Sequence, residues 1–286
     1  MPIYAPTLPP RPDLTKAASP ILVLAKFDLA RMLRQKLGRF FGIVFLGVLA
    51  INLMVLYAKH LMVVSPDMAQ LKDFAELVLP QPASFQASLL HPSMLFFLWF
   101  QAALISGGLI ARDTLHRIRP LIYAHPVRPS DYVASKAISA IAVPLCVQFL
   151  FIFLPWLLSL LIAGPDGPVW PTAPLYLIPA AAINSVLIAS VALGASSISS
   201  TPKSGFGWAL ALLFGSTAIG GILAGIFRAQ AWLALSPMGL TDAWPRILCG
   251  VEGAHIPLWA AAASTSAHFF LWTYVVVSRT RPSEAV

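Results

Sequence analysis

The side chains most able to do chemistry gather in one segment, residues 110–136, which reads I-A-R-D-T-L-H-R-I-R-P-L-I-Y-A-H-P-V-R-P-S-D-Y-V-A-S-K. Four arginines and two aspartates surround a short apolar stretch, Leu121 to Tyr123. A simple connection between two helices needs only about 2–8 residues, so this segment is long enough to form an element of its own. Apolar groups flanked by arginines suit insertion into a groove on another protein, where the guanidinium groups form a polar rim.

These residues do not have the pattern of an active site. The six histidines are scattered along the chain, no H-E-x-x-H motif occurs, and the acidic residues lie almost wholly between the apolar segments. The phosphate-binding motif G-x-x-x-x-G-K-[ST] is also missing. The two cysteines fall on different elements and suggest neither a disulfide nor a metal site. We therefore expect a non-catalytic chain without metal-binding or cofactor-binding residues.

The remainder of the sequence is suited to lipid. Hydrophobic residues make up 58% of the 286 residues and charged residues 10%, against about 25% charged residues in soluble domains. About 20 apolar residues are needed to cross a bilayer, and six segments reach that length. The sequence therefore predicts an all-α polytopic membrane protein with six transmembrane helices. They are 40–58, 92–111, 133–162, 175–197, 206–227 and 256–277.

The orientation follows from the basic residues. If the N-terminus lies inside, fifteen of the nineteen Lys and Arg residues fall on the inner side. The outer side then keeps Lys59, Lys72, Arg228 and Arg246. This positive-inside bias predicts a multi-pass protein of the bacterial cytoplasmic (inner) membrane, with both termini cytoplasmic. The net charge of +8 is thus a topology signal and does not predict a nucleic-acid partner.

We expect two regions, a disordered proline-rich cytoplasmic tail at 1–20 and a six-helix transmembrane domain at 21–286. Residues 21–39 are amphipathic, with apolar and basic residues at helical spacing. We interpret them as a helix in the headgroup layer, and contact with a cytoplasmic partner is compatible with that position. The outer connections are expected to hold a surface helix at 67–79 and an interfacial or re-entrant segment within 228–255.

Few polar residues interrupt the spans. The amides of Asn52, Gln101, Gln148 and Asn184 either join helices by hydrogen bonds or line a substrate path, and both interpretations remain open. Apart from Lys136 near the inner end of the third span, the spans carry no Asp, Glu, Lys or Arg, and His268 in the sixth has no ionisable partner within them. That scarcity counts against ion-coupled transport.

A G-x-x-x-G pair in the fifth span, Gly221 and Gly225, allows another helix to approach closely. The approaching helix belongs either to the same chain or to the seam of a dimer.

The segment 110–136 resembles the corresponding loop of ABC-2 type permeases, the membrane subunits of ABC exporters. That family has an acidic residue after its second helix, then a short helix. A pattern close to Arg-Pro-(Val/Leu)-(Ser/Thr)-Arg-x-(Asp/Glu)-Tyr, three residues and Lys follows. The counterparts here are Asp113, Pro126, Val127, Asp131, Tyr132 and Lys136. His125 stands in place of a common Arg and Ser135 in place of a common Gly, so the contact chemistry of the loop is expected to differ at these two positions. The six spans, the amphipathic N-terminal helix and the last outer loop extend the resemblance over most of the chain.

The resemblance implies that the coupling loop 112–131 docks in a cleft of a separate ATPase subunit. Two ATPase copies would bind the ATP and Mg, and two membrane subunits, identical or paralogous, would enclose the substrate path. The importer-type loop with Glu-Ala-Ala is missing, which favours export. The coupling residues expected from the resemblance are Arg112, Asp113, Arg117, Arg119, Leu121, Ile122, Tyr123, Pro126, Arg128 and Asp131.

The expected function is therefore that of a permease subunit of an ABC exporter. Two alternatives stay open. The chain could be an ion-independent secondary transporter or channel, or a structural membrane subunit of an envelope complex.

Overall fold

The computed structural model describes residues 19–64, 92–123, 127–162, 172–250 and 256–280, and every regular element in these ranges is a helix. Residues 1–18 of the predicted tail, the predicted helix at 67–79 and the tip of the 110–136 loop lie outside the described residues, whereas Pro20, the last residue of the predicted tail, belongs to the first helix. The helices are α1 (Pro20–Arg34), α2 (Lys36–Val64), α5 (Pro92–Ile105), η3 (Ser106–Gly108), α6 (Leu109–Leu115), α7 (Ile118–Tyr123), α8 (Pro129–Ile162), α9 (Ala173–Ser197), α10 (Pro202–Phe227), η4 (Gln230–Leu235), α11 (Pro237–Leu248) and α12 (Leu258–Thr280).

Six helical stretches are long and apolar enough to cross a membrane, and each coincides with one predicted span. They are Lys36–Ala58, Met94–Leu115, Pro129–Ile162, Ala173–Ser197, Pro202–Phe227 and Leu258–Thr280. The prediction of six spans is confirmed, and the chain is a multi-pass membrane protein. The second stretch passes the predicted end at Ala111 and takes in Arg112 and Asp113. Lys136 lies within the third, as in the predicted span, and in the second stretch the ionisable side chains that exceed the expectation are those of Arg112 and Asp113.

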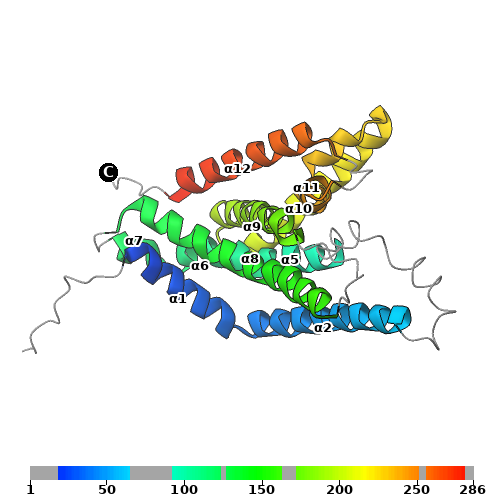
Figure 1. Cartoon of the computed structure of the whole chain (residues 1–286). Helices are drawn as coiled ribbons and strands as arrows, with labels where there is room; N and C mark the ends of the chain where they lie inside the picture. The colour runs from blue at the N-terminus through cyan, green and yellow to red at the C-terminus, as the bar shows by residue number, and fades with distance from the viewer. Residues whose placement is uncertain (1–18, 65–91, 124–126, 163–171, 251–255, 281–286) are drawn as a thin grey trace, which may run out of the picture.

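Helix α9 forms the centre of the bundle. Figure 1 shows it between α12 on one side and α8 and α5 on the other. Most of its residues are buried, and from Leu187 to Ser197 all of them are. Small residues allow this central position, because a side chain at Gly194 would overlap the ring of Trp272 in α12. Helix α9 is therefore covered by protein, whereas only a small part of α2 and α10 is buried.

The second span is interrupted by the 3₁₀ turn η3, whose sequence is Ser-Gly-Gly. A hydroxyl of α9 compensates for the disturbed backbone, because Ser196 Oγ accepts hydrogen bonds from the amides of Ile110 (2.9 Å) and Ala111 (3.0 Å). Helix α10 crosses closely at the same place. A Cβ atom at Gly205 would overlap the carbonyl oxygen of Gly107. The break in the second span is thus held by α9 and α10 together.

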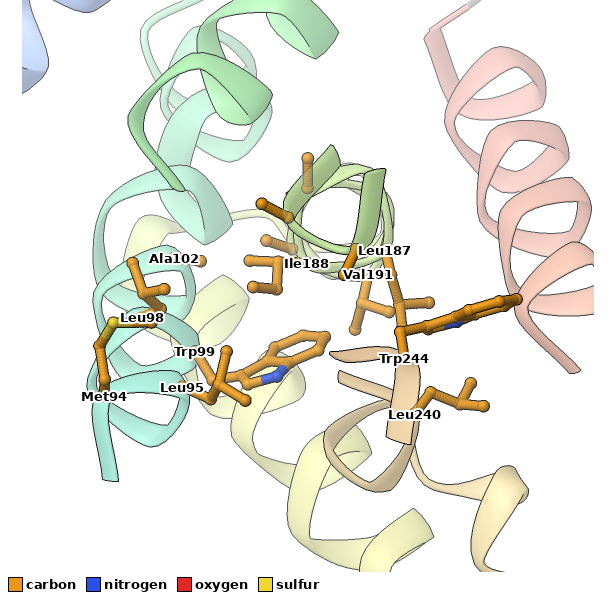
Figure 2. Packing of buried hydrophobic residues seen from close by; sticks show 14 of the residues in the cluster. Met94, Leu95, Leu98, Trp99, Ala102, Leu187, Ile188, Val191, Leu240 and Trp244 are labelled. Carbon is orange, nitrogen blue, oxygen red and sulfur yellow. The ribbon is translucent and has the colours of Figure 1, made fainter. Parts of the chain in front are cut away.

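The segment after α10 folds back into the bundle. Helix α11 packs on α9 and α5, and Figure 2 shows Leu240 and Trp244 of α11 beside Leu187 and Val191 of α9. Asn184, which donates a hydrogen bond to Thr241 O at 3.0 Å, lies about 16 Å along α9 from its start at 1.5 Å per residue. Helix α11 therefore reaches the middle of α9, and its re-entrant position in the bilayer stays a prediction.

Candidate functional site

The residues singled out by the sequence gather at one end of the bundle. We call this the basic end and define it by α1, α6, α7, the first turns of α8 and the last turn of α12 (Figure 1). Together with Arg117 and Arg128, which lie directly before α7 and α8, these elements carry nine of the fifteen Lys and Arg residues of the described ranges.

A buried ion cluster joins three helices of the basic end. The ammonium group of Lys136 in α8 lies 2.9 Å from a carboxylate oxygen of Asp28 in α1 and 2.6 Å from one of Asp113 in α6. The same oxygen of Asp113 accepts a hydrogen bond from the hydroxyl of Tyr132 at 2.9 Å. No charged side chain of the three is more than 5% exposed. Buried charges need partners of this kind, so the cluster fixes the relative positions of α1, α6 and α8.

The charges of the cluster do not balance within it. Two carboxylates share one ammonium group, and the guanidinium groups of Arg31 and Arg112 lie within electrostatic range of them. Burial raises the pKa of Asp28 above its ordinary value, and the neighbouring Lys136 acts in the opposite direction. Burial is the larger of the two causes, so the stability of the ionised pair depends on its close geometry.

Helix α7 is fixed to its surroundings by two side chains. The guanidinium group of Arg119 donates to the carbonyl oxygen of Arg279 at 3.1 Å, and the hydroxyl of Tyr123 donates to that of Thr280 at 3.0 Å. These carbonyls belong to the last turn of α12, where helical carbonyls lack partners of their own. Burial raises the pKa of Tyr123, so its hydroxyl stays protonated and remains a donor.

A continuous series of contacts leads from α7 to α1. The ring of Tyr123 meets the ring of Tyr132 edge-on, with centroids 6.0 Å apart. Tyr132 donates to Asp113, and Lys136 then joins Asp113 to Asp28. Neither a nucleophile with a base nor an open polar cavity occurs along this series. The series therefore suits mechanical coupling and not catalysis. A displacement of α7 would be transmitted to α1 through the packed rings, the hydrogen bond and the ion pairs.

The predicted coupling residues occupy three kinds of position. Arg117 and Arg128 are exposed. Asp113 is buried in the ion cluster and faces away from solvent. The other predicted coupling residues with described side chains are partly buried. They are Arg112, Arg119, Ile122, Tyr123 and Asp131. The side chain of Leu121 and the whole of Pro126 lie outside the described residues. Whether these residues couple to an ATPase stays a prediction.

Two turns shape the surface around α7. Arg117 has a φ of 52° and forms the left-handed turn that separates α6 from α7. Asp131 accepts a hydrogen bond from the amide of Arg128 at 3.2 Å and so closes the start of α8. Leu115, His116, Arg117 and Pro120 are exposed beside these turns. The turns next to α7 are thus exposed, while α7 itself is attached to α12 by Arg119 and Tyr123.

The buried amides of Gln148 and Asn184 take part in helix packing. Gln148 donates to Ser185 Oγ at 2.9 Å, and Asn184 donates to Thr241 O at 3.0 Å. The indole of Trp99 adds a hydrogen bond to Thr241 Oγ1 at 3.2 Å. The network joins α5, α8, α9 and α11, as the packing interpretation requires. Asn52 is only partly buried.

Gln101 lies at a small cavity between α1, α2, α5 and α8. The side chain is 6% exposed, and its Oε1 atom has no hydrogen-bond partner among the described residues. The cavity measures about 20 Å³, which is room for about one water molecule and for no organic substrate. Its lining consists of Met32, Leu33, Gly38, Gln101, Ala102, Ile105, Ser106, Val143 and Pro144.

The glycine pair of the fifth span points away from the bundle. A Cβ atom at Gly221 or Gly225 would meet no described atom within 4 Å. Packing inside the described chain therefore does not use this pair, and its place in a dimer stays a prediction.

Asp28 is the functional residue that the sequence reasoning missed. It lies on the amphipathic segment, where an acidic residue looks like one more polar group facing water. A signal for it was present, because a lysine inside a long apolar helix, such as Lys136, needs an acidic partner.

Comparison with known proteins leaves the family open. No model of a known protein family matches the chain, and no curated protein matches it. Among the described residues, no group of three or more His, Cys, Asp or Glu side chains could hold a metal ion.

Substitution Asn184→Leu separates the packing interpretation from a substrate path. We expect the free energy of unfolding in detergent to fall by about 1 kcal/mol, within the range of buried hydrogen bonds between membrane helices. Unfolding by a denaturing detergent measures it. Ser190→Ala is the matched control, because the hydroxyl of Ser190 bonds only within α9, to Leu187 O. Unchanged stability together with lost transport would instead assign Asn184 to a substrate path.

Proposed function

We propose that this chain is the membrane subunit of an ATP-driven exporter of the ABC-2 permease type. In this proposal α7 and its flanking turns dock on a separate ATPase subunit. One observation carries it: Pro120 of α7 and the preceding turn, residues 115–117, are exposed, while Arg119 and Tyr123 anchor the helix to α12. A short helix of that kind suits the transfer of motion, since a partner that pushes it also loads α12 and the ion cluster.

The energy would come from the partner. The chain has no phosphate-binding motif, so ATP and Mg would be bound by two ATPase copies. A second permease, identical or paralogous, would complete the transporter. The exposed face of α10, with Gly221, Gly225, Ile222 and Ile226, is our candidate for the seam between the two membrane subunits.

In this proposal the basic end faces the cytoplasm and both termini lie on the same side of a bacterial inner membrane, which the positive-inside bias supports. Helix α1 would then lie at the cytoplasmic headgroup layer, before the chain enters the bilayer in α2.

A second candidate function is favoured by one observation. The ion cluster of Asp28, Asp113 and Lys136 is buried, and such groups occur in ion-coupled transporters. The buried cluster makes an ATPase-independent secondary transporter the alternative to test. Its position counts against that alternative, because Lys136 lies only about 10 Å along α8 from Pro129, near one end of the bundle.

Co-purification distinguishes the two candidates. The tagged full chain is isolated from its native membrane in mild detergent, and associated proteins are identified by mass spectrometry and assayed for ATP hydrolysis. A co-purifying nucleotide-binding subunit supports the exporter. Isolation of the chain without any ATPase, together with substrate movement in vesicles that contain no ATP, overturns it.

Charge reversal at Arg117 tests the docking surface directly. Arg117→Glu should reduce ATPase association about tenfold or more, because it places an acid on an exposed arginine-rich rim. Arg117 is preferable to Arg119, whose guanidinium group holds α7 to α12. Association is measured by titrating the purified ATPase against the chain in nanodiscs.

Arg228→Glu is the matched control for that titration. Arg228 is exposed at the far end of α10 and also has a positive φ, of 50°. It should leave ATPase association unchanged. Equal affinities of both variants and the parent chain would count against docking through α7.

A further inference from the structure

The outward face of α1 combines large apolar side chains with cations. The side chains of Leu22, Phe27 and Leu33 are 60%, 64% and 62% exposed. Lys26 and Arg34 are exposed among them and lie eight residues apart, on one side of the helix. We call this surface the α1 face.

Burial of Asp28 leaves the α1 face without any acidic residue. Asp28 is the only acidic residue between Pro20 and Phe40, and it points inward to Lys136. No hydrogen bond or salt bridge to another described residue engages the side chains of the five neighbouring cations. They are Lys26, Arg31, Arg34, Lys36 and Arg39. Arg31 lies within electrostatic range of Asp28. The positive charge that the described chain does not compensate is therefore that of Lys26 and Arg34 on the α1 face, followed by Lys36 and Arg39 at the start of α2.

The α1 face continues into the exposed surface of the first span. Only Gln35 separates α1 from α2, and Figure 1 shows the two helices end to end. Phe40, Ile43 and Leu46 of α2 are exposed in turn, and in a membrane such side chains face acyl chains. The cations thus lie next to the level at which the apolar surface of the span begins.

We propose that the α1 face binds an acidic phospholipid, whose phosphate lies between Lys26 and Arg34 and whose acyl chains follow Phe27 and Leu33 toward α2. The inference rests on the position of α1 in the proposed function, at the headgroup layer. Charge complementarity selects the occupant, because anionic headgroups attract Lys and Arg next to a span. Apolar side chains interleaved with the cations suit a lipid, which offers both kinds of surface at one place.

The expected contribution of each cation is about fivefold in affinity, from the strength of a basic residue near an anionic surface. Removal of Lys26 and Arg34 together should therefore weaken binding of an acidic lipid by more than tenfold. Affinity for a zwitterionic lipid should change by less than about twofold, because that headgroup carries no net charge.

Native mass spectrometry of the purified full chain in detergent provides the test. Phosphatidylglycerol and phosphatidylcholine are titrated separately, and the populations with bound lipid give the affinities. The parent chain is compared with Lys26→Gln/Arg34→Gln and with Lys203→Gln/Arg228→Gln. The second variant loses the same charge from exposed positions outside α1. Size-exclusion chromatography verifies that each variant is folded.

Loss of phosphatidylglycerol binding in the α1 variant alone supports the proposal. Equal loss in both variants overturns it, because the effect would then be one of total charge. Unchanged lipid binding with loss of a co-purifying protein overturns it in favour of a protein contact. The lipid titration contains no ATPase, so failure of ATPase co-purification refutes the proposed function without altering this result.

Discussion

Substitution of Lys136 by methionine is expected to lower the free energy of unfolding by about 3–5 kcal/mol, the usual effect of removing one partner from a buried ion pair. Without the ammonium group, the carboxylates of Asp28 and Asp113 would remain buried with like charges near each other. Methionine nearly conserves the volume, so the loss reports charge more than packing. The effect is measured by thermal unfolding of the detergent-solubilised chain, with size-exclusion chromatography as the readout of folded protein at each temperature.

A triple variant tests whether the loss comes from the unpaired buried carboxylates. Lys136→Met combined with Asp28→Asn and Asp113→Asn removes all three charges, and stability should recover most of the loss. Lys203→Met is the control, because Lys203 is exposed at the start of α10. If the single variant at Lys136 unfolds at the same temperature as this control, the cluster does not hold α1, α6 and α8 together.

Substitution of Gly205 by alanine is the second change with a large expected effect. The added Cβ would overlap the carbonyl oxygen of Gly107, and a backbone atom cannot rotate away as a side chain can. The loss should reach about 3 kcal/mol, the upper part of the usual range for overpacking. The same unfolding assay measures it, and crosslinking between α5 and α10 shows whether the helices separate.

The matched control lies two residues further on the same helix. A Cβ at Gly207 would meet no described atom within 4 Å. Gly207→Ala should therefore leave stability unchanged or raise it by up to about 1 kcal/mol, through higher helix propensity. Equal losses for the two alanine variants would mean that the close crossing of η3 and α10 is not what limits stability.

The spans were predictable because lipid imposes one requirement on all of them. Each must cover about 30 Å with apolar side chains, and that requirement is visible in any window of the sequence. Their positions were found within a few residues, as for the predicted span 175–197 and the observed α9, Ala173–Ser197. The all-helical fold follows, since helices satisfy their backbone groups locally.

The candidate site was less predictable because its contacts join distant residues. The pair Asp28 and Lys136 spans 108 positions, and the local pattern around Asp28 is that of a polar helix face. Gly107 and Gly205 were missed for a similar reason. Each helix contributes one glycine to the crossing, so neither shows the G-x-x-x-G spacing that drew attention to Gly221 and Gly225. Only the tertiary arrangement reveals which small residue faces a neighbour.

The attachment of α7 to α12 bears on the order of assembly. Both carbonyl acceptors, those of Arg279 and Thr280, are synthesised more than 150 residues after the donors Arg119 and Tyr123. A growing chain that has inserted its first spans therefore still lacks the support for α7. The surface around α7 becomes complete only when the last helix has entered the bilayer. A chain interrupted before that point would leave α7 unsupported, so a partner that recognises α7 would distinguish finished subunits from unfinished ones.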